Sequence, residues 1–221
     1  MLRALLPEGV AVEETSTDPP GAELYPEEAA LVRDAVEKRR AEFTTVRYCA
    51  RRALSALGLP PAPVLPDRHG APRWPAGVVG SLTHCHGFRA AALAHGTDVT
   101  MLGIDAEPHA PLPDGVLKVI GLPSEQAWTE SAPPGTHWDR LLFSAKESVY
   151  KAWYPHTGQR LGFEDAELRF EPARGTFTAR LLARPPAQPP GRPPLPRTLD
   201  GRWLTGNGLA VTAVVVAPPS A

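Results

Sequence analysis

The chain has 221 residues and 43% hydrophobic content, which suits one large soluble domain or two small ones. A formal net charge of -1 and a pI near 6.7 exclude a general attraction to nucleic acid or anionic membranes, so any anion-binding site must be local. The two cysteines lie outside any CxxC pair, which favours a reducing cytoplasm over a disulfide framework or a zinc cage. We expect a cytoplasmic protein without a signal peptide or membrane span.

The first half is expected to be helical and then to form a sheet. Between Pro26 and Gly58, acidic residues follow the proline and apolar residues recur at helical spacing. This pattern predicts one long helix or two abutting ones, with Thr44 and Thr45 as the irregularity. Prolines and glycines over residues 59–77 predict a connecting loop. The spacing of an antiparallel meander follows in three short apolar segments, at 78–82, 88–94 and 99–107.

The second half repeats this order of helix and sheet. Segments 115–130 and 137–154 have helical periodicity, and strand patterns follow at 165–171, 175–183, 201–205 and 208–216. The proline-rich stretch 183–198 interrupts the second sheet, because proline supplies no donor to a strand ladder. The sequence therefore predicts an α+β fold of two similar halves related by a pseudo-two-fold, each a small antiparallel sheet packed with helices. We place the division between residues 1–105 and 106–221.

Two carboxylates share one face of the strand that contains "LGIDAE". Strand alternation puts Asp105 and Glu107 on the same face as Gly103, with the carboxylates roughly 7 Å apart along the strand. Two like charges at this separation indicate either a cation between them or screening by water. The alternative to a cation site is a solvated strand end before Pro108.

The later stretch "FSAKESVYKAW" adds a third carboxylate. Glu147 and Lys151 lie one helical turn apart, which is also the spacing of a plain surface ion pair worth only ~0.3 kcal/mol. Apolar neighbours such as Phe143 and Trp153 favour a mostly buried helix, where a charge needs a partner or a ligand. Carboxylates without His or Cys suit Mg²⁺, which shares its coordination shell with water and substrate phosphates. We therefore expect a Mg²⁺ and phosphate site at Asp105, Glu107 and Glu147.

Basic residues for such a phosphate recur in the first half. Spacings of seven, seven and four residues predict one stripe, either a solvated face or an anion site, made by Arg33, Arg40, Arg47 and Arg51. His84 is expected in the turn after a strand, where the ring and backbone N–H groups can meet a phosphate. The alternative for His84 is a structural or merely exposed histidine.

The order and spacing of "GIDAE" and "FSAKESVYKAW" resemble the signature of the Sfp-type 4′-phosphopantetheinyl transferases, a G-x-D-x-E strand followed by a W/F-x-x-K-E-x-x-x-K helix. "KRRAEFTTVRYCARRAL" and "GAPRWPAGVVGSLTHC" are similar to the actinobacterial branch of that family, and the resemblance covers roughly residues 20 to 216. It implies a monomeric, Mg²⁺-dependent enzyme. Such an enzyme moves the phosphopantetheine arm of coenzyme A to a serine of an apo acyl or peptidyl carrier protein, in fatty acid, polyketide or non-ribosomal peptide synthesis.

The resemblance also implies a role for each matching residue. Asp105, Glu107 and Glu147 hold the Mg²⁺, and Glu147 is the candidate general base, with Glu107 second. Lys151 contacts the diphosphate and protonates or neutralises the departing 3′,5′-ADP. The remaining coenzyme A contacts are expected at Arg39, Arg47, Thr83, His84 and Lys146. The helical wheel prefers Arg40 to Arg39 as the partner of Arg47.

Two positions depart from the mycobacterial member of that branch. Pro66 stands where that relative has a lysine facing the ligand phosphate, with Arg68 and His69 close by. Arg160 stands where it has a tryptophan near the pantetheine channel. Two rival functions remain on the residues alone. The first is a Mg²⁺-dependent phosphoester or diphosphate hydrolase in which water replaces the serine, and the second is a non-catalytic coenzyme A-binding module.

Overall fold

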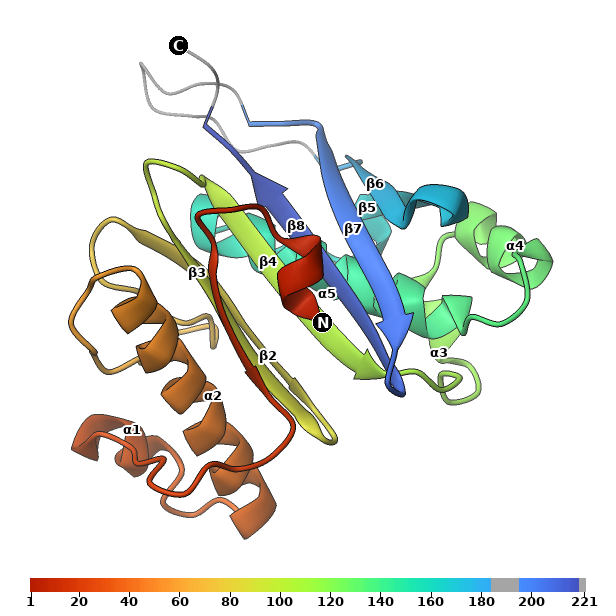
Figure 1. Ribbon diagram of the computed structural model, residues 1–221. Coiled ribbons are helices and arrows are strands. Elements are labelled where there is room, and N and C mark those ends of the chain that lie inside the picture. Colours follow the sequence, from red (N-terminus) through yellow and green to blue (C-terminus); the bar gives the residue numbers. More distant parts are fainter. Residues whose placement is uncertain (184–194, 219–221) are drawn as a thin grey trace.

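A computed structural model describes residues 1–183 and 195–218 of the chain (Figure 1). In chain order, the elements up to the middle of the chain are η1 (Leu2–Leu5), β1 (Ala11–Thr15), α1 (Pro26–Leu31), α2 (Glu37–Ala56), β2 (Val78–Cys85), β3 (Phe88–His95) and β4 (Met101–Pro108). The later elements are α3 (Val116–Ile120), α4 (Pro123–Ser131), α5 (Trp138–Thr157), η2 (Phe163–Asp165), β5 (Ala166–Glu171), η3 (Pro172–Arg174), β6 (Thr176–Leu181), β7 (Thr198–Gly206) and β8 (Leu209–Val216).

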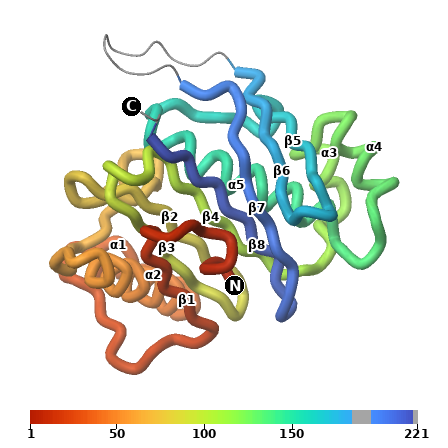
Figure 2. Tube along the Cα trace, turned by 45° about the horizontal axis from the view of Figure 1, so that its top comes forward, coloured from red at the N-terminus to blue at the C-terminus, as the bar shows by residue number. Residues whose placement is uncertain are grey.

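The strands form two antiparallel sheets, each beside one 20-residue helix. The first sheet has the order β1-β3-β2 and packs on α2, and the second has the order β4-β8-β7-β6-β5 and packs on α5. Figures 1 and 2 show the two helices on either side of the strands, with β2 and β4 next to each other in the middle. The predicted α+β fold of two similar halves is confirmed. The division of the chain after residue 105 stays a prediction.

The sequence pattern predicted that β4 continues the meander of β2 and β3, but it does not. It pairs with β8 along its whole length, from Met101 opposite Val216 to Pro108 opposite Leu209. Its other edge faces β2 without a backbone ladder. There, Ser81 Oγ and Thr83 Oγ1 accept hydrogen bonds from the backbone N–H groups of Ile104 and Ala106, both at 3.0 Å. Side-chain hydroxyls thus satisfy the donors of this strand and join the two halves.

The third strand of the first sheet is β1, for which no strand was expected. Its residues pair antiparallel with β3, with Ala11 opposite Leu93 and Thr15 opposite Arg89. The short element lies at the sheet edge, and its Val12 is buried in a core that also includes Leu2, Ile104 and Ala92. This core fills the space between the two sheets, which is why an N-terminal segment of weak local signal becomes a strand.

The region from Pro26 contains two helices, and the break lies between Leu31 and Glu37 rather than at the threonine pair. Thr44 sits inside α2, where its hydroxyl donates to Arg40 O at 2.8 Å, one turn back. The other predicted helices are confirmed. Segment 115–130 becomes α3 and α4, and 137–154 becomes α5, which ends at Gly158 in the left-handed region (φ 69°).

The predicted strands of the second half form the second sheet, and β7 begins at Thr198. A turn of Asn207 (φ 50°) and Gly208 (φ 74°) joins β7 to β8, as expected for a tight hairpin. Most of the proline-rich stretch 183–198 lies outside the described residues. Within the described ranges, no helix combines the length and apolarity needed to cross a bilayer.

Candidate active site

Strand β4 presents its acidic side chains to helix α5. Gly103 lies on the same face, and a Cβ added there would lie 1.9 Å from Ser148 O and 2.6 Å from Ala152 N. Only a glycine allows the backbones of β4 and α5 to approach this closely. The close approach brings the next two residues of that face, Asp105 and Glu107, against basic side chains of α5, as the strand alternation predicted.

Asp105 is held by both halves of the molecule. Lys151 Nζ donates to its Oδ1 at 2.6 Å, and the Thr83 hydroxyl donates to the same oxygen at 3.3 Å. The side chain is buried, and in the part of the chain that the structure describes its Oδ2 has no hydrogen-bond partner. Leaving a buried polar atom unsatisfied costs about 1–3 kcal/mol, more for a charged group. This oxygen is therefore suited to a cation or a donor supplied by a ligand.

Glu107 pairs with Arg140, a residue that the sequence reasoning missed. Arg140 Nη1 donates to Glu107 Oε2 at 3.0 Å, and its other nitrogens donate to the carbonyls of Ala110 and Pro111. Arg140 thus fixes both the carboxylate and the chain that follows β4. Burial and the nearby charge of Asp105 raise the pKa of Glu107, against the opposing effect of Arg140. Arg140 lies two and three turns before Glu147 and Lys151 on the helix, and this spacing was the available signal.

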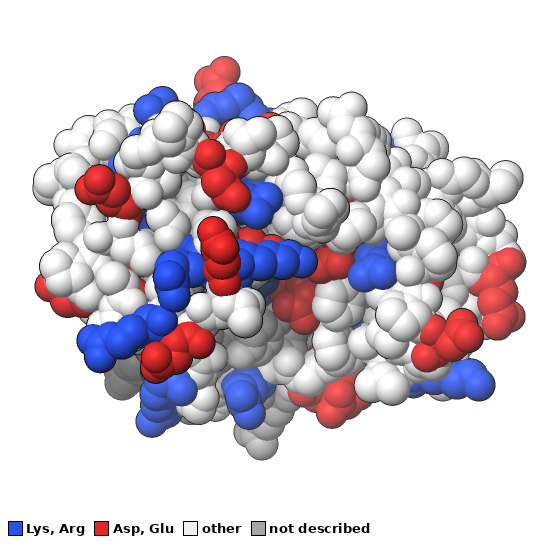
Figure 3. Space-filling model, turned by 90° about the horizontal axis from the view of Figure 1, so that it is seen from below, with Lys and Arg blue, Asp and Glu red and all other residues white. Residues whose placement is uncertain are grey.

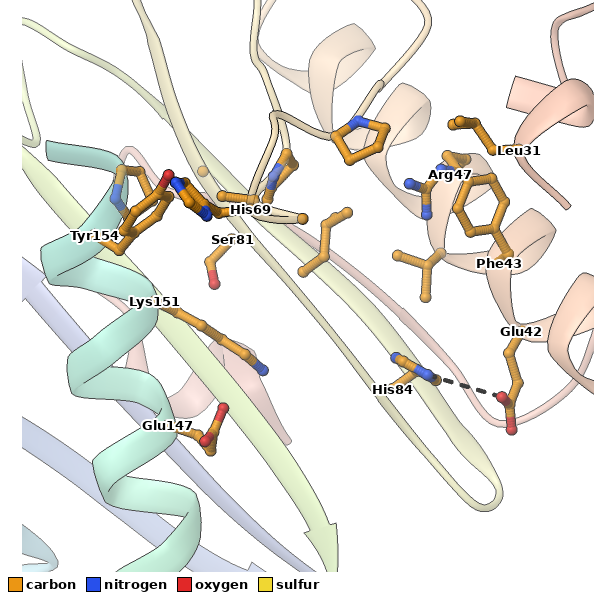
Figure 4. A pocket seen from close by; sticks show the side chains of 18 of the residues that line it. Leu31, Glu42, Phe43, Arg47, His69, Ser81, His84, Glu147, Lys151 and Tyr154 are labelled. Atoms are coloured by element: carbon orange, nitrogen blue, oxygen red, sulfur yellow. Dashed lines mark ion pairs between the residues drawn. The ribbon is translucent and has the colours of Figure 1, made fainter. Parts of the chain in front are cut away.

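Glu147, on α5, joins Asp105 and Glu107, and we call these three carboxylates the acidic corner. Figure 4 shows the Glu147 carboxylate and the Lys151 ammonium projecting from this helix into the space that His84 and Arg47 face from the other half. Burial is the main cause that raises the pKa of Glu147, with Asp105 adding to it and Lys151 opposing it. A carboxylate of raised pKa beside an open cleft is suited to accept a proton.

The three carboxylates do not form a ready-made metal cage. Within the described ranges, no group of three or more His, Cys, Asp or Glu side chains lies close enough to hold an ion by itself. Two of the three acids instead carry protein cations, Lys151 on Asp105 and Arg140 on Glu107. The donor set still fits a hard divalent ion, because it offers only oxygen ligands and includes the unsatisfied Asp105 Oδ2.

A cleft of about 570 Å³ separates the acidic corner from basic residues of α2. Arg47 is buried there, with its Cζ 3.2 Å from the centroid of the Phe43 ring. Burial lowers the pKa of the Arg47 guanidinium to about 10, so it remains charged at neutral pH. Its Nε has no hydrogen-bond partner among the described residues. A buried cation that lines a cleft in this way fits an anionic group of a ligand.

Arg39, and not Arg40, accompanies Arg47 in the cleft. Arg39 Nη1 lies 2.9 Å from His84 Nε2, and both side chains line the cleft. Arg40 instead donates to the carbonyls of Arg33 and Ala35 and closes the connection between α1 and α2. The family motif, which indicated Arg39, therefore gave a better prediction than the helical wheel, because a helical wheel does not show which face of the helix the preceding loop covers.

His84 lies on strand β2, one residue before its end, rather than in the turn beyond it. Burial, followed by the charge of Arg39, lowers the pKa of this histidine, and Glu42 at 3.7 Å opposes that effect. The imidazole is thus neutral at pH 7 and accepts from Arg39 Nη1.

The predicted arginine stripe does not form one surface. Arg33 precedes α2, Arg40 bonds to backbone, and Arg51 pairs with the buried Glu28 at 2.9 Å. Only Arg47 of the four lines the cleft. On the described part of the face shown in Figure 3, positive and negative side chains are interspersed rather than segregated. The described part of this face therefore presents no broad surface of a single charge.

A loop between α2 and β2 covers one end of the cleft. Pro66 and His69 line it, whereas Arg68 donates from Nε to His69 Nε2 at 2.9 Å. The Tyr154 hydroxyl of α5 donates to Asp67 at 2.8 Å and ties the loop to the second half. Of the two residues near the missing lysine, His69 is thus the one that reaches the cleft.

Lys146 lies outside the main cleft. Its Nζ has three acceptors, Phe163 O at 2.7 Å, Ala166 O at 3.0 Å and the buried Glu125 at 2.7 Å. It lines instead a second hollow of about 350 Å³, which has Arg160, Leu161 and Gly162 in its wall. Glu147 and Tyr150 line both the cleft and this hollow, so the two spaces meet at Glu147.

Family models match both halves of the chain. Residues 27–94 match the 4′-phosphopantetheinyl transferase N-terminal domain, and residues 101–190 match the 4′-phosphopantetheinyl transferase superfamily. The first match covers the helix and hairpin that carry Arg39, Arg47 and His84. The second covers the acidic corner.

Similar proteins extend over nearly the whole chain. The 4′-phosphopantetheinyl transferase Svp of Streptomyces mobaraensis is 57% identical over 100% of this chain and 91% of its own length. The transferase PptT of Mycobacterium tuberculosis is 49% identical over 98% of this chain and 96% of its own length. Npt of Nocardia iowensis is 46% identical over 98% of this chain and 100% of its own length. The chain belongs to the 4′-phosphopantetheinyl transferase superfamily, and the resemblance stated from its motifs is confirmed.

Proposed function

We propose that this protein transfers the 4′-phosphopantetheine arm of coenzyme A to a serine of an apo acyl or peptidyl carrier protein and releases 3′,5′-ADP. Family membership supports the transferase activity. The observation that carries the assignment of the site is the pairing, across one cleft, of an acidic corner with a buried arginine. Coenzyme A has both matching features, a diphosphate that a metal and lysine can neutralise and a separate ribose 3′-phosphate.

Arg47, Arg39 and His84 bind the 3′-phosphate in this proposal. The Arg47 guanidinium is held by Phe43 and keeps its Nε for a ligand, and a charge-assisted bond to phosphate is worth about 1.5–3 kcal/mol. His69 stands at the loop end of the same cleft and supplies polar contact where Pro66 offers none. Thr83 contributes indirectly, because its hydroxyl orients Asp105.

We assign a Mg²⁺ ion to Asp105, Glu107 and Glu147. When bound, the ion would neutralise the diphosphate and the charge that develops on it. The protein residues prepare this site: Lys151 and Arg140 compensate the carboxylates in its absence, and Thr83 keeps Asp105 in place. The Lys151 ammonium, which pairs with Asp105 in this structure, then turns from that carboxylate to the departing 3′,5′-ADP.

Glu147 is the proposed general base. The serine hydroxyl gives its proton to the Glu147 carboxylate while the serine oxygen attacks the β-phosphorus of coenzyme A, and the bond to the 3′,5′-ADP oxygen breaks. Glu107 is the weaker candidate, because Arg140 occupies one of its oxygens. The raised pKa of Glu147 favours acceptance of that proton. Positioning of the two reactants in the cleft supplies most of the remaining acceleration.

The proposed partners are apo carrier proteins of fatty acid, polyketide or non-ribosomal peptide synthesis. We propose that the enzyme acts as a cytoplasmic monomer, which is in keeping with its two free cysteines, Cys49 and Cys85.

Intact-mass analysis of an apo carrier protein, incubated with the enzyme, coenzyme A and Mg²⁺, tests the activity. A phosphopantetheine adduct on the carrier supports transfer. Cleavage of coenzyme A without an adduct would identify the rival hydrolase, and binding without either product would identify a non-catalytic module. Omission of Mg²⁺, with a chelator present, should abolish the adduct. A panel of apo carriers at limiting enzyme then identifies the preferred pathway.

A further inference from the structure

The ion pair of Lys146 and Glu125 lies against the free edge of strand β5. This strand is the last in its sheet, so one row of its backbone groups has no neighbour among the strands that the structure describes. Lys146 Nζ donates to Ala166 O at 3.0 Å, and Glu125 Oε1 accepts from Leu168 N at 2.7 Å. Residues 166 and 168 are alternate positions of the strand, so both groups point to the same side. Two side chains thus take the place of a pairing strand.

The pair is fully buried and fully satisfied. Lys146 is 4% exposed and Glu125 3% exposed. The lysine uses its three donors on Phe163 O, Ala166 O and Glu125, and the other Glu125 oxygen also accepts from Leu122 N at 2.7 Å, at the start of α4. A buried ion pair with every atom bonded specifies one arrangement of the elements it joins, here α4, α5 and the start of β5.

These contacts shape the second hollow. Phe163 and Ala166, whose carbonyls Lys146 binds, stand in its wall together with Arg160 and Gly162. Glu147, the residue after Lys146, lines both this hollow and the main cleft. Release of the pair would free the 160–166 wall and leave the edge carbonyl of Ala166 and the edge N–H of Leu168 without partners.

We infer that Lys146 and Glu125 are positioning residues that hold the wall of the second hollow, and that Lys146 does not contact the phosphates of coenzyme A. The inference rests on the proposed function, and it places the nucleotide in the main cleft and the pantetheine arm in the second hollow, which shares Glu147 and Tyr150 with that cleft. It predicts a selective effect. Loss of the pair should impair recognition of the arm and leave recognition of the nucleotide intact.

The test compares coenzyme A with 3′,5′-ADP, which lacks the arm. Both ligands are titrated by calorimetry against wild type, Lys146→Met, Glu125→Gln and the double variant. We expect each single variant to bind coenzyme A at least 10-fold more weakly and 3′,5′-ADP within twofold of wild type. Because both residues act through one pair, the double variant should lose no more affinity than the worse single variant. Lys118→Met, an exposed lysine of α3, is the matched control and should behave as wild type.

A phosphate contact at Lys146 gives a different pattern. Lys146→Met would then weaken both ligands equally, whereas Glu125→Gln would weaken neither, and this result would overturn the inference. Equal coenzyme A affinity in all folded variants would overturn it as well, since the pair would then be only structural. Should Lys146→Met fail to fold, Glu125→Gln alone decides, because its amide retains an acceptor for Leu168 N. Failure of wild type to bind coenzyme A would instead refute the proposed function.

Discussion

Substitution of Gly103 by alanine tests why strand β4 and helix α5 can meet. The new Cβ would lie 1.9 Å from Ser148 O, about 1.5 Å short of an ordinary contact of 3.4 Å, and 2.6 Å from Ala152 N. Both obstacles are backbone atoms, so no side-chain rotation relieves them. The strand and the helix must therefore separate by roughly 1.5 Å, or the strand must bend, at an overpacking cost of ~3 kcal/mol.

The separation acts directly on the site. Lys151 Nζ and Asp105 Oδ1, now 2.6 Å apart, would move to about 4 Å, beyond hydrogen-bond reach. A misplacement of about 1 Å can reduce an enzymatic rate roughly 100-fold. For a chain of this length, ~3 kcal/mol corresponds to a fall in Tm of about 6–12 °C. We expect Gly103→Ala to show both effects.

Circular dichroism melts give the Tm, and the intact-mass assay gives the initial rate of carrier modification. Gly206→Ala is the control, because among the described residues its Cβ would meet only Met1 Cε, at 3.6 Å, and it should match wild type in both measurements. A Gly103→Ala protein with wild-type Tm would refute the close-packing argument. A protein with lowered Tm but unchanged rate would refute the link between this contact and the alignment of the site.

Three further predictions concern the cleft. Arg47→Ala should weaken the binding of coenzyme A, measured by calorimetry, about 10- to 100-fold, but it should not weaken the binding of 3′-dephospho-coenzyme A. The control Arg40→Ala should lower only the Tm. Equal losses of affinity for both ligands in Arg47→Ala would contradict the 3′-phosphate assignment. Burial and Arg39 lower the pKa of His84, so it is neutral at pH 7 and should take up a proton when 3′,5′-ADP binds. This proton uptake, measured in buffers of different ionisation enthalpy, should disappear in His84→Gln. In the wild type it should be largest at pH values between the lowered pKa of His84 in the free protein and its higher pKa in the complex. Glu147→Gln should reduce carrier modification at least 100-fold at saturating Mg²⁺, and wild-type transfer by that variant would remove Glu147 as base and ligand.

Local signals were sufficient for most elements of the second half. Helix α5 was predicted nearly to its ends, because its apolar periodicity lies within the segment itself. The same holds for β5 and β6, whose buried and more exposed residues alternate, and for β8, which is a nearly continuous apolar run. The acid face of β4 followed from alternation alone, and the spacing of the two motifs was enough to indicate the family.

The pairing of strands that lie far apart in the sequence could not be predicted from local patterns. The partner of β4 is β8, more than a hundred residues away, and the hydroxyls of Ser81 and Thr83 replace the ladder that a meander would have supplied. Strand β1 forms because the space between the sheets buries Val12, a gain that exists only after the halves meet.

For the candidate site as well, the sequence determined some features and the tertiary structure decided the others. The sequence alone determined which residues have the chemistry: three carboxylates, two lysines beside one of them, and arginines ahead of them in the chain. Only the tertiary structure decided that Lys151 meets Asp105 while Lys146 turns to Glu125 and the edge of β5, and that Arg39 enters the cleft while Arg40 does not. The physical reason is that a charged side chain takes the direction in which its burial is compensated, and the compensating groups come from elements far apart in the sequence.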